Sequence, residues 1–250
     1  MKVLSQHEVE QFITRGHVAL RDAFPREVAA ECRAFLWKEL GLSPDDRAAW
    51  KKNVVHVQKV FTSEPFTGAF TKRLFDAIDD VMGEGRWVPP GGLGWWPVAF
   101  PGFEPPPWKP PTGGWHVDGI QFHHRLTSRD QGLLPLFVLS DIGPGDGGTA
   151  FDEGSHRVAA RILAAAEPAG LDVNELAKRV TATPRLNVVE GTGRAGDDIL
   201  LHPFMLHARS PNTGNSVRFI CNPCIQYKEA MRLDGPALSP VERAIKEAVA

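Results

Sequence analysis

Short β-like runs separated by glycine and proline constrain the fold of this chain more than any other feature. The 250 residues include 24 Gly and 21 Pro. From Gly91 onward, apolar runs of strand length alternate with turn-forming residues. These runs are Leu93–Phe100, Gly114–Asp118, Leu133–Ile142, Gly148–Phe151, Leu186–Val189, Asp198–His202 and Val217–Ile225. Many short strands with Gly- and Pro-rich turns are typical of a β-sandwich or barrel, and they argue against a helical bundle.

Helical periodicity flanks this β-rich region. Ser5 can cap a first helix that runs to about Thr14, with Glu8 at the capping-box position. Apolar spacing predicts further helices and two early strands. The helices are Pro25–Leu40, Phe66–Met82, Ala159–Val180 and Pro240–Val249, and the strands are His17–Leu20 and Asn53–Phe61. There is no internal repeat and no linker, so we expect one domain over residues 1–250, mainly β with flanking helices.

Composition excludes several classes of function. The net charge is -2 at pH 7, which gives no electrostatic reason to expect a nucleic acid or an anionic membrane as partner. No apolar run approaches the roughly 20 residues that cross a bilayer, and the first residues lack a secretory signal. We therefore expect a cytoplasmic protein that binds neither nucleic acid nor membrane, and the oligomeric state stays open. Three cysteines cannot build a disulfide framework. Cys221 and Cys224 form a C-x-x-C within a strand-like run, where two ordinary thiols are favoured over a zinc half-site or redox pair.

The first chemical motif is His116-Val117-Asp118. On a strand, residues two apart point to the same face, so an imidazole and a carboxylate can converge on one metal ion. The motif is weak evidence alone, because a chain with 9 His and 30 acidic residues is expected to contain about one such triplet by chance. It follows the stretch Pro101–Pro111, whose six prolines predict a loop.

The second motif lies about ninety residues further on. Gly196 and Asp197 form a turn before an apolar strand, and the chain then reaches His207, a turn-forming Ser-Pro-Asn-Thr-Gly-Asn cluster and a strand that carries Arg218. Because His207 and Arg218 stand across a predicted hairpin, both can face one barrel interior. His202 competes with His207 as a ligand, but its spacing favours a packed histidine.

This set of residues has a coherent chemistry. Two histidines and one carboxylate on one face of an octahedral iron leave three positions open. A 2-oxo acid can fill two of them through its keto oxygen and carboxylate, and dioxygen can take the third. The far carboxylate of a 2-oxo diacid then needs a bidentate cationic partner, and arginine suits it best.

At this point the chain resembles the phytanoyl-CoA dioxygenase family. The resemblance rests on Trp115 to Asp118, on Leu136 to Asp141 with Gly147 to Phe151 and Gly154 to Arg157, and on His202 to Arg218. The opening helix and Gly16 to Leu20 also look like that family. These motifs occur in the family's order over nearly the whole chain.

The resemblance implies a double-stranded β-helix, which is a cupin-like jelly roll. It also implies oxidative decarboxylation of 2-oxoglutarate to succinate and CO2, coupled to attack on an unactivated C–H bond by iron(II) and O2. By position, His116, Asp118 and His207 match the metal ligands and catalytic centre, and Arg218 matches the 2-oxoglutarate anchor. Thr149 matches a hydroxyl near the cosubstrate. A basic residue on the early strand often assists, and here His56, or else Lys59 on the opposite face of that strand, can take that place.

Departures from the family pattern also carry information. Gly113 and Gly114 replace a glutamine that some members place before the first histidine, and Asp152-Glu153-Gly154 replaces a Pro-Gly pair. The carboxylate of Asp118 is retained, which argues against the halogenating relatives. Two alternative functions remain. One is a metal-free or zinc-holding binding protein on the same scaffold. The other is a cupin isomerase or dioxygenase without cosubstrate, which would leave Arg218 unexplained.

Several other residues have two interpretations. Trp95, Trp96, Trp108 and Trp115 can line a substrate pocket or anchor core and loops, and Trp108 is the best candidate for a lid contact. His123 and His124 are expected at the surface or against substrate, and His156 is expected to act as a cap. Arg125, Arg129 and Arg209 are expected to be solvated.

Substrate selectivity should be determined by two loops and one helical segment: Pro101–Gly114, Ile120–Leu133 and Ala159–Val180. We expect a small metabolite, such as a natural-product intermediate, because no basic cluster suits an acyl-CoA.

Overall fold

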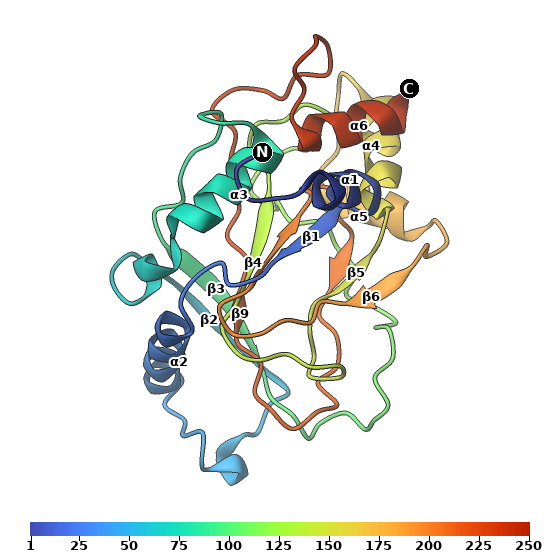
Figure 1. Cartoon of the computed structure of the whole chain (residues 1–250). Coiled ribbons are helices and arrows are strands. Elements are labelled where there is room, and N and C mark those ends of the chain that lie inside the picture. Colours follow the sequence, from blue (N-terminus) through green and yellow to red (C-terminus); the bar gives the residue numbers. More distant parts are fainter.

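The computed structural model describes residues 1–250 and contains antiparallel sheets of four, three and two strands with helices packed outside them (Figure 1). The helices are α1 (Gln6–Arg15), α2 (Arg26–Leu40), α3 (Lys72–Met82), α4 (Ser155–Ala166), α5 (Val173–Thr181) and α6 (Pro240–Val249). The strands are β1 (His17–Leu20), β2 (Val54–Phe61), β3 (Leu93–Ala99), β4 (Leu134–Val138), β5 (Ala150–Asp152), β6 (Val188–Glu190), β7 (Asp198–Leu201), β8 (His207–Ala208) and β9 (Ile220–Cys221). Short 3-10 turns cover Arg47–Ala49 and Phe66–Ala69.

The larger sheet is built around β4 and β7. Its order is β1-β7-β4-β9, and a bridge between Ala99 and Arg218 continues it to the β3–β2 pair. The smaller sheet has the order β6-β5-β8, and a bridge between His116 and His207 extends it by one more segment. This arrangement is a cupin-like jelly roll, so the fold predicted from the sequence is confirmed.

The two faces of β4 belong to different parts of the core. Leu134, Leu136 and Val138 join a cluster of nine buried residues that also draws on β5, β7 and β9, and that cluster fills the space between the sheets. Phe137 belongs instead to the larger cluster beneath the helices. Since successive strand residues point to opposite faces, a strand buried on both faces reads as a continuous apolar run. The run Leu133–Ile142 does so.

The helices gather mostly at one end of the molecule. Helix α6 contacts α1, α3 and α4, and α4 contacts α5, whereas α2 lies apart beside β2 (Figure 1). The capping box of Ser5 and Glu8 is present at the start of α1. Arg243 of α6 forms an ion pair with Glu10 of α1 at 2.6 Å. The N-terminal and C-terminal helices are therefore joined outside the sheets, away from the interior.

Several predicted elements are shorter or divided. The strands expected over Leu133–Ile142 and Val217–Ile225 are reduced to Leu134–Val138 and Ile220–Cys221. The helix expected over Phe66–Met82 begins as a 3-10 turn, and the α-helix starts only after Thr71 accepts a hydrogen bond from the backbone of Leu74. The helix expected over Ala159–Val180 is two helices, since Pro168 cannot continue a regular turn and Asp172 caps α5. The strand expected over Gly114–Asp118 is reduced to the single bridge at His116. No helix has both the length and the apolar character needed to cross a membrane.

Candidate metal centre

Two histidines meet where the loop after Pro111 returns to the smaller sheet. His116 and His207 exchange both backbone hydrogen bonds at 2.9 Å, and their ring centroids are 4.3 Å apart. Asp118 follows two residues later, as the strand-like spacing requires. Its Oδ1 lies 3.3 Å from Nε2 of His116 and 3.6 Å from Nε2 of His207. The three potential ligand atoms all lie within 4.8 Å of one another.

The outer nitrogen of each ring is held by a carbonyl oxygen. Nδ1 of His116 lies 2.8 Å from the oxygen of Gly114, and Nδ1 of His207 lies 3.0 Å from the oxygen of Met205. A carbonyl oxygen only accepts, so each Nδ1 carries the proton and each neutral ring turns an Nε2 lone pair inward. Asn222 donates to Oδ2 of Asp118 at 2.8 Å, which leaves Oδ1 for the shared point.

Three lone-pair donors facing one another require a cation between them. Burial opposes ionisation of Asp118, but the charges and hydrogen bonds of His207 and His116 outweigh it and hold the pKa of that carboxyl well below its usual range. Burial likewise opposes the charged form of His116, yet the Asp118 carboxylate raises the pKa of that imidazole. A divalent ion at the same point supplies this positive charge without protonating the rings. Two imidazoles, one carboxylate and oriented outer-shell partners suit a ferrous ion with open positions.

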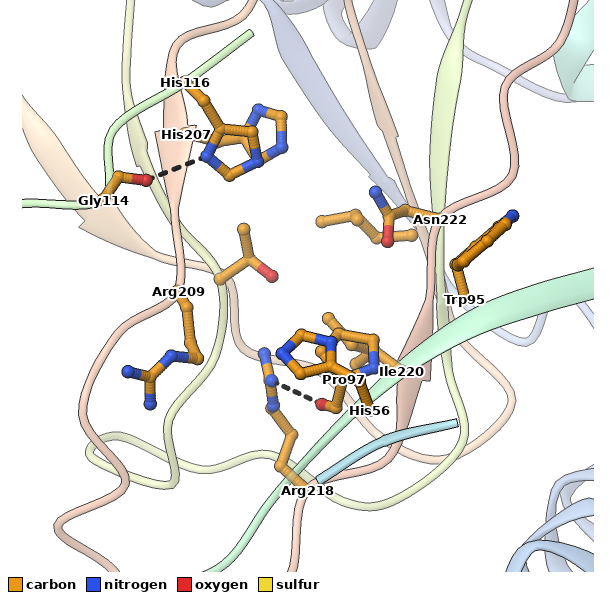
Figure 2. A pocket seen from close by; sticks show the side chains of 12 residues that line it. His56, Trp95, Pro97, Gly114, His116, His207, Arg209, Arg218, Ile220 and Asn222 are labelled. Carbon is orange, nitrogen blue, oxygen red and sulfur yellow. Dashed lines mark hydrogen bonds between the residues drawn. The ribbon is translucent and has the colours of Figure 1, made fainter. Parts of the chain in front are cut away.

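An inner cavity of about 350 Å³ opens from this point toward the larger sheet. Figure 2 shows the two histidines at one end of it and the two guanidinium groups at the other. Its lining residues are His56, Trp95, Pro97, Gly114, His116, Leu136, Thr149, His207, Arg209, Arg218, Ile220 and Asn222.

Arg218 is a buried cation with no acidic partner. Its side chain is 1% exposed, and its one hydrogen bond runs from Nη2 to the oxygen of Pro97 at 2.8 Å. Its Nε has no partner, and no carboxylate lies within ion-pair distance. Burial, and then the charge of Arg209, lowers the pKa of Arg218 to about 10, so it stays protonated at neutral pH. A buried charge without a counter-ion is costly, and an incoming anion would remove that cost.

Thr149 and His56, the other residues expected near the cosubstrate, line the same cavity. Lys59, the alternative to His56, pairs with Glu39 at 2.5 Å and does not line it. Geometry therefore favours His56 over Lys59.

An outer cavity of about 640 Å³ lies on the other side of the candidate metal centre. It shares Trp95, His116 and Asn222 with the inner cavity. The rest of its lining comes from the loop after Asp118, from α5 and from the chain after β9: Val117, Asp118, Gly119, Ile120, Gln121, Phe122, Asp130, Val173, Asn174, Ala177, Pro223, Cys224 and Gln226. Two of the three segments expected to determine selectivity thus border this cavity, whereas Pro101–Gly114 does not, and of that segment only Gly114 lines the inner cavity.

Several histidines lie elsewhere. His202 is fully buried, 4.8 Å from the ring of His156, and its Nε2 lies 3.3 Å from the oxygen of Val241. His156 does not cap its own helix, since its Nε2 lies 3.0 Å from the oxygen of Ile13 at the end of α1. His124 was expected at the surface or against substrate, and this is wrong. It is 1% exposed and its Nε2 lies 3.2 Å from the oxygen of Gly119.

Sequence reasoning missed one residue, did not foresee the position of a second and misjudged a third. Arg209 was expected to be solvated, and it is exposed, but it also lines the inner cavity. Asn222 was not considered, although its place two residues after a cavity-facing strand position could have indicated it. Trp108 was the candidate for a lid contact, but it donates to Oγ of Ser210 at 3.0 Å and lines neither cavity.

Fold and site together define the class of protein: a jelly roll with a two-histidine, one-carboxylate centre beside a cationic pocket, which is the arrangement of non-haem iron(II), 2-oxoglutarate-dependent oxygenases. The sequence model of the phytanoyl-CoA dioxygenase family, PhyH, matches residues 3–220, and the chain belongs to that family. A search of the curated proteins finds no sequence match.

Solved structures with the same fold are distant in sequence. HygX from Streptomyces hygroscopicus is 16% identical with a TM-score of 0.55, covering 90% of this chain and 88% of HygX. EctD from S. alaskensis is 21% identical with a TM-score of 0.53, covering 89% of this chain and 77% of EctD. At this identity the likeness shows the fold alone.

Proposed function

We propose that this protein is an iron(II)- and 2-oxoglutarate-dependent oxygenase that hydroxylates, desaturates or cyclises a small organic metabolite, with release of succinate and CO2. His116, Asp118 and His207 would hold the iron, and Arg218 would hold the cosubstrate with Thr149 and His56 beside it. A bound ferrous ion supplies the means to activate O2 next to a chelated 2-oxo acid.

The observation that carries this proposal is the unpartnered guanidinium of Arg218 in the cavity that opens at the three ligands. A dicarboxylic acid with one end at the metal would place its other end toward Arg218 and Arg209, and a bidentate pair would satisfy Arg218 Nε. A binding protein that only held zinc would have no use for this buried cation. HygX has been solved with nickel and 2-oxoglutarate bound, which is consistent with this assignment.

The contribution of the protein's own residues to the reaction is to orient the metal ligands. The carbonyls of Gly114 and Met205 fix the rings of the two histidines, and Asn222 fixes the carboxylate of Asp118. The apolar side chains of Leu136 and Ile220 border the inner cavity and give part of its wall an apolar surface. These contacts would hold the three metal ligands where the two cavities meet, so that the cosubstrate would bind in the inner cavity and the substrate in the outer one.

Anaerobic titration with iron(II) and then 2-oxoglutarate tests the proposal. We expect a weak visible charge-transfer band from the chelate, and succinate formation once O2 is admitted. Asp118→Ala should abolish the band, whereas Asp45→Asn, an exposed carboxylate without a side-chain partner, should leave it unchanged. Absence of both band and succinate in the unaltered protein would refute the proposal.

A further inference from the structure

The two cavities have opposite electrostatic character. The inner cavity contains Arg209, Arg218 and His56 and no carboxylate, whereas the sixteen residues that line the outer cavity include no Lys or Arg. Besides the candidate metal ligands, the one charged residue of the outer cavity is Asp130. Its neighbours include four side-chain amides: Gln121, Asn174, Asn222 and Gln226.

Asp130 is half-buried, and its carboxylate has no hydrogen bond or ion pair within the protein. Its backbone oxygen is engaged by the thiol of Cys224 at 3.3 Å, which ties this part of the loop to the chain after β9. A carboxylate without an ion-pair partner, at the wall of a cavity that no Lys or Arg lines, repels anions and attracts an ammonium or guanidinium group.

Trp95 supplies the second feature of the outer cavity. Its φ of +61° lies in the left-handed region that side chains with a Cβ rarely adopt. Gln58 and Lys59 of β2 oppose Trp95 alone, since the pairing shifts between Val57 and Val60. Such a bulge redirects a side chain, and bulges are common beside active sites.

The redirected indole lies where both cavities meet. Its neighbour Trp96 is completely buried, whereas Trp95 is 56% exposed and packs against no other aromatic ring. The backbone of Trp95 is held in an unfavourable conformation, and its indole ring is exposed at a cavity wall. Such a ring is suited to stacking on a ligand or to binding a cation over its face.

We propose that the substrate is an amine: a small molecule with an ammonium or guanidinium group that binds Asp130 and a ring or hydrocarbon face that packs on Trp95. This inference rests on the proposed function, since it assigns the substrate of that metal centre. The same lining disfavours an acyl-CoA, because its phosphates would meet Asp130 and find no Lys or Arg in the outer cavity.

Three probes with one phenylethyl body and different end groups test the proposal: phenethylamine, 2-phenylethanol and 3-phenylpropionate. Each is titrated into protein already loaded with nickel(II) and 2-oxoglutarate, so that the inner cavity is filled and no turnover occurs. Loading is checked first by visible absorption. If nickel and 2-oxoglutarate do not bind, the proposed function fails, and the substrate inference has no site to rest on.

With the loaded protein, we expect the amine to bind at least about tenfold more tightly than the carboxylate. Asp130→Asn should remove most of that preference and leave the affinity for the alcohol unchanged, and Asp45→Asn is the matched control. Trp95→Ala should weaken the amine and the alcohol alike by about fivefold, and Trp95→Phe should retain most of the affinity. Equal binding of amine and carboxylate, or no binding by any probe, would overturn the proposal.

Discussion

The inner and outer cavities touch the same three side chains, Trp95, His116 and Asn222, but differ in nearly everything else. The inner cavity is the smaller one, at about 350 Å³, and it is cationic; the outer cavity is about 640 Å³, with amides, aromatic rings and a free carboxylate. Because the two adjacent cavities carry opposite charge, they can bind two different molecules at once, and neither molecule suits the other's cavity.

The difference also lies in how each cavity is built. The inner cavity is walled by strands and by the residues flanking them, among them His56, Pro97 and Leu136, which are fixed by sheet pairing. Loops and α5 form most of the outer wall. A rigid inner wall suits a constant cosubstrate, and an outer wall of loops suits a substrate that varies among relatives.

Loss of the metal centre should have the largest effect on activity, because this centre lies where the two cavities meet. Asp118→Ala takes away the one anionic ligand, so we expect succinate formation to fall by at least about a thousandfold. Metal content after purification and succinate yield measure this. A variant with full metal content and near-normal turnover would show that the two cavities do not meet at a metal.

A substitution of Arg218, at the far end of the inner cavity from the metal centre, should weaken binding of 2-oxoglutarate alone. Arg218→Gln removes a buried charge opposite the cosubstrate, so the dissociation constant of 2-oxoglutarate should rise by about a hundredfold or more. Isothermal titration under anaerobic conditions measures it. Arg218→Lys should recover only part of the loss, since lysine lacks the bidentate fork. An equal loss of probe binding in the outer cavity would mean that the cavities are not separate.

Asn222 should show an intermediate effect on the metal. Asn222→Ala frees Oδ2 of Asp118, and loss of such an outer-shell partner costs about 10- to 100-fold in metal affinity. Competition with a metal-binding dye gives the value. Asn222→Ser is the less disruptive comparison, and unchanged metal affinity in both variants would show that the hydrogen bond does not orient the ligand.

The smallest effects should come from the inner-cavity residues next to Arg218. Thr149→Val and His56→Gln each remove one polar group, and we expect KM for 2-oxoglutarate to rise by about threefold to tenfold with kcat little changed. Steady-state succinate formation at varied cosubstrate separates the two constants. A fall in kcat at constant KM would place these side chains at the chemical step instead.

Much of the architecture could be predicted from the sequence because its signals are local. The capping box at Ser5, the left-handed glycine after α2 and the apolar run of β4 each specify their element without help from distant residues. The candidate ligands could be selected because an i, i+2 pair and a hairpin impose strong constraints on direction.

What sequence reasoning missed depends on the tertiary structure. Arg209 stands two residues after His207, just beyond the two-residue strand β8, and its place in the cavity wall depends on the distant segments that complete that wall. Burial of His124 follows from its backbone bridge to Leu171, far along the chain. The conformation of Trp95 follows from a pairing shift between two strands. Each needs two distant segments to be placed together before its role is visible.

The chain from Arg218 to Cys224 passes both cavities and the metal centre in order. Arg218, Ile220, Asn222 and Cys224 line them at every second position, whereas Cys221 points into the opposite, helix-covered core. The two thiols of the C-x-x-C therefore look away from each other. Deleting a single residue here would turn every later side chain of this stretch to the opposite face. The roles assigned to Arg218 and Asn222 therefore depend on the length of this stretch as well as on its side chains.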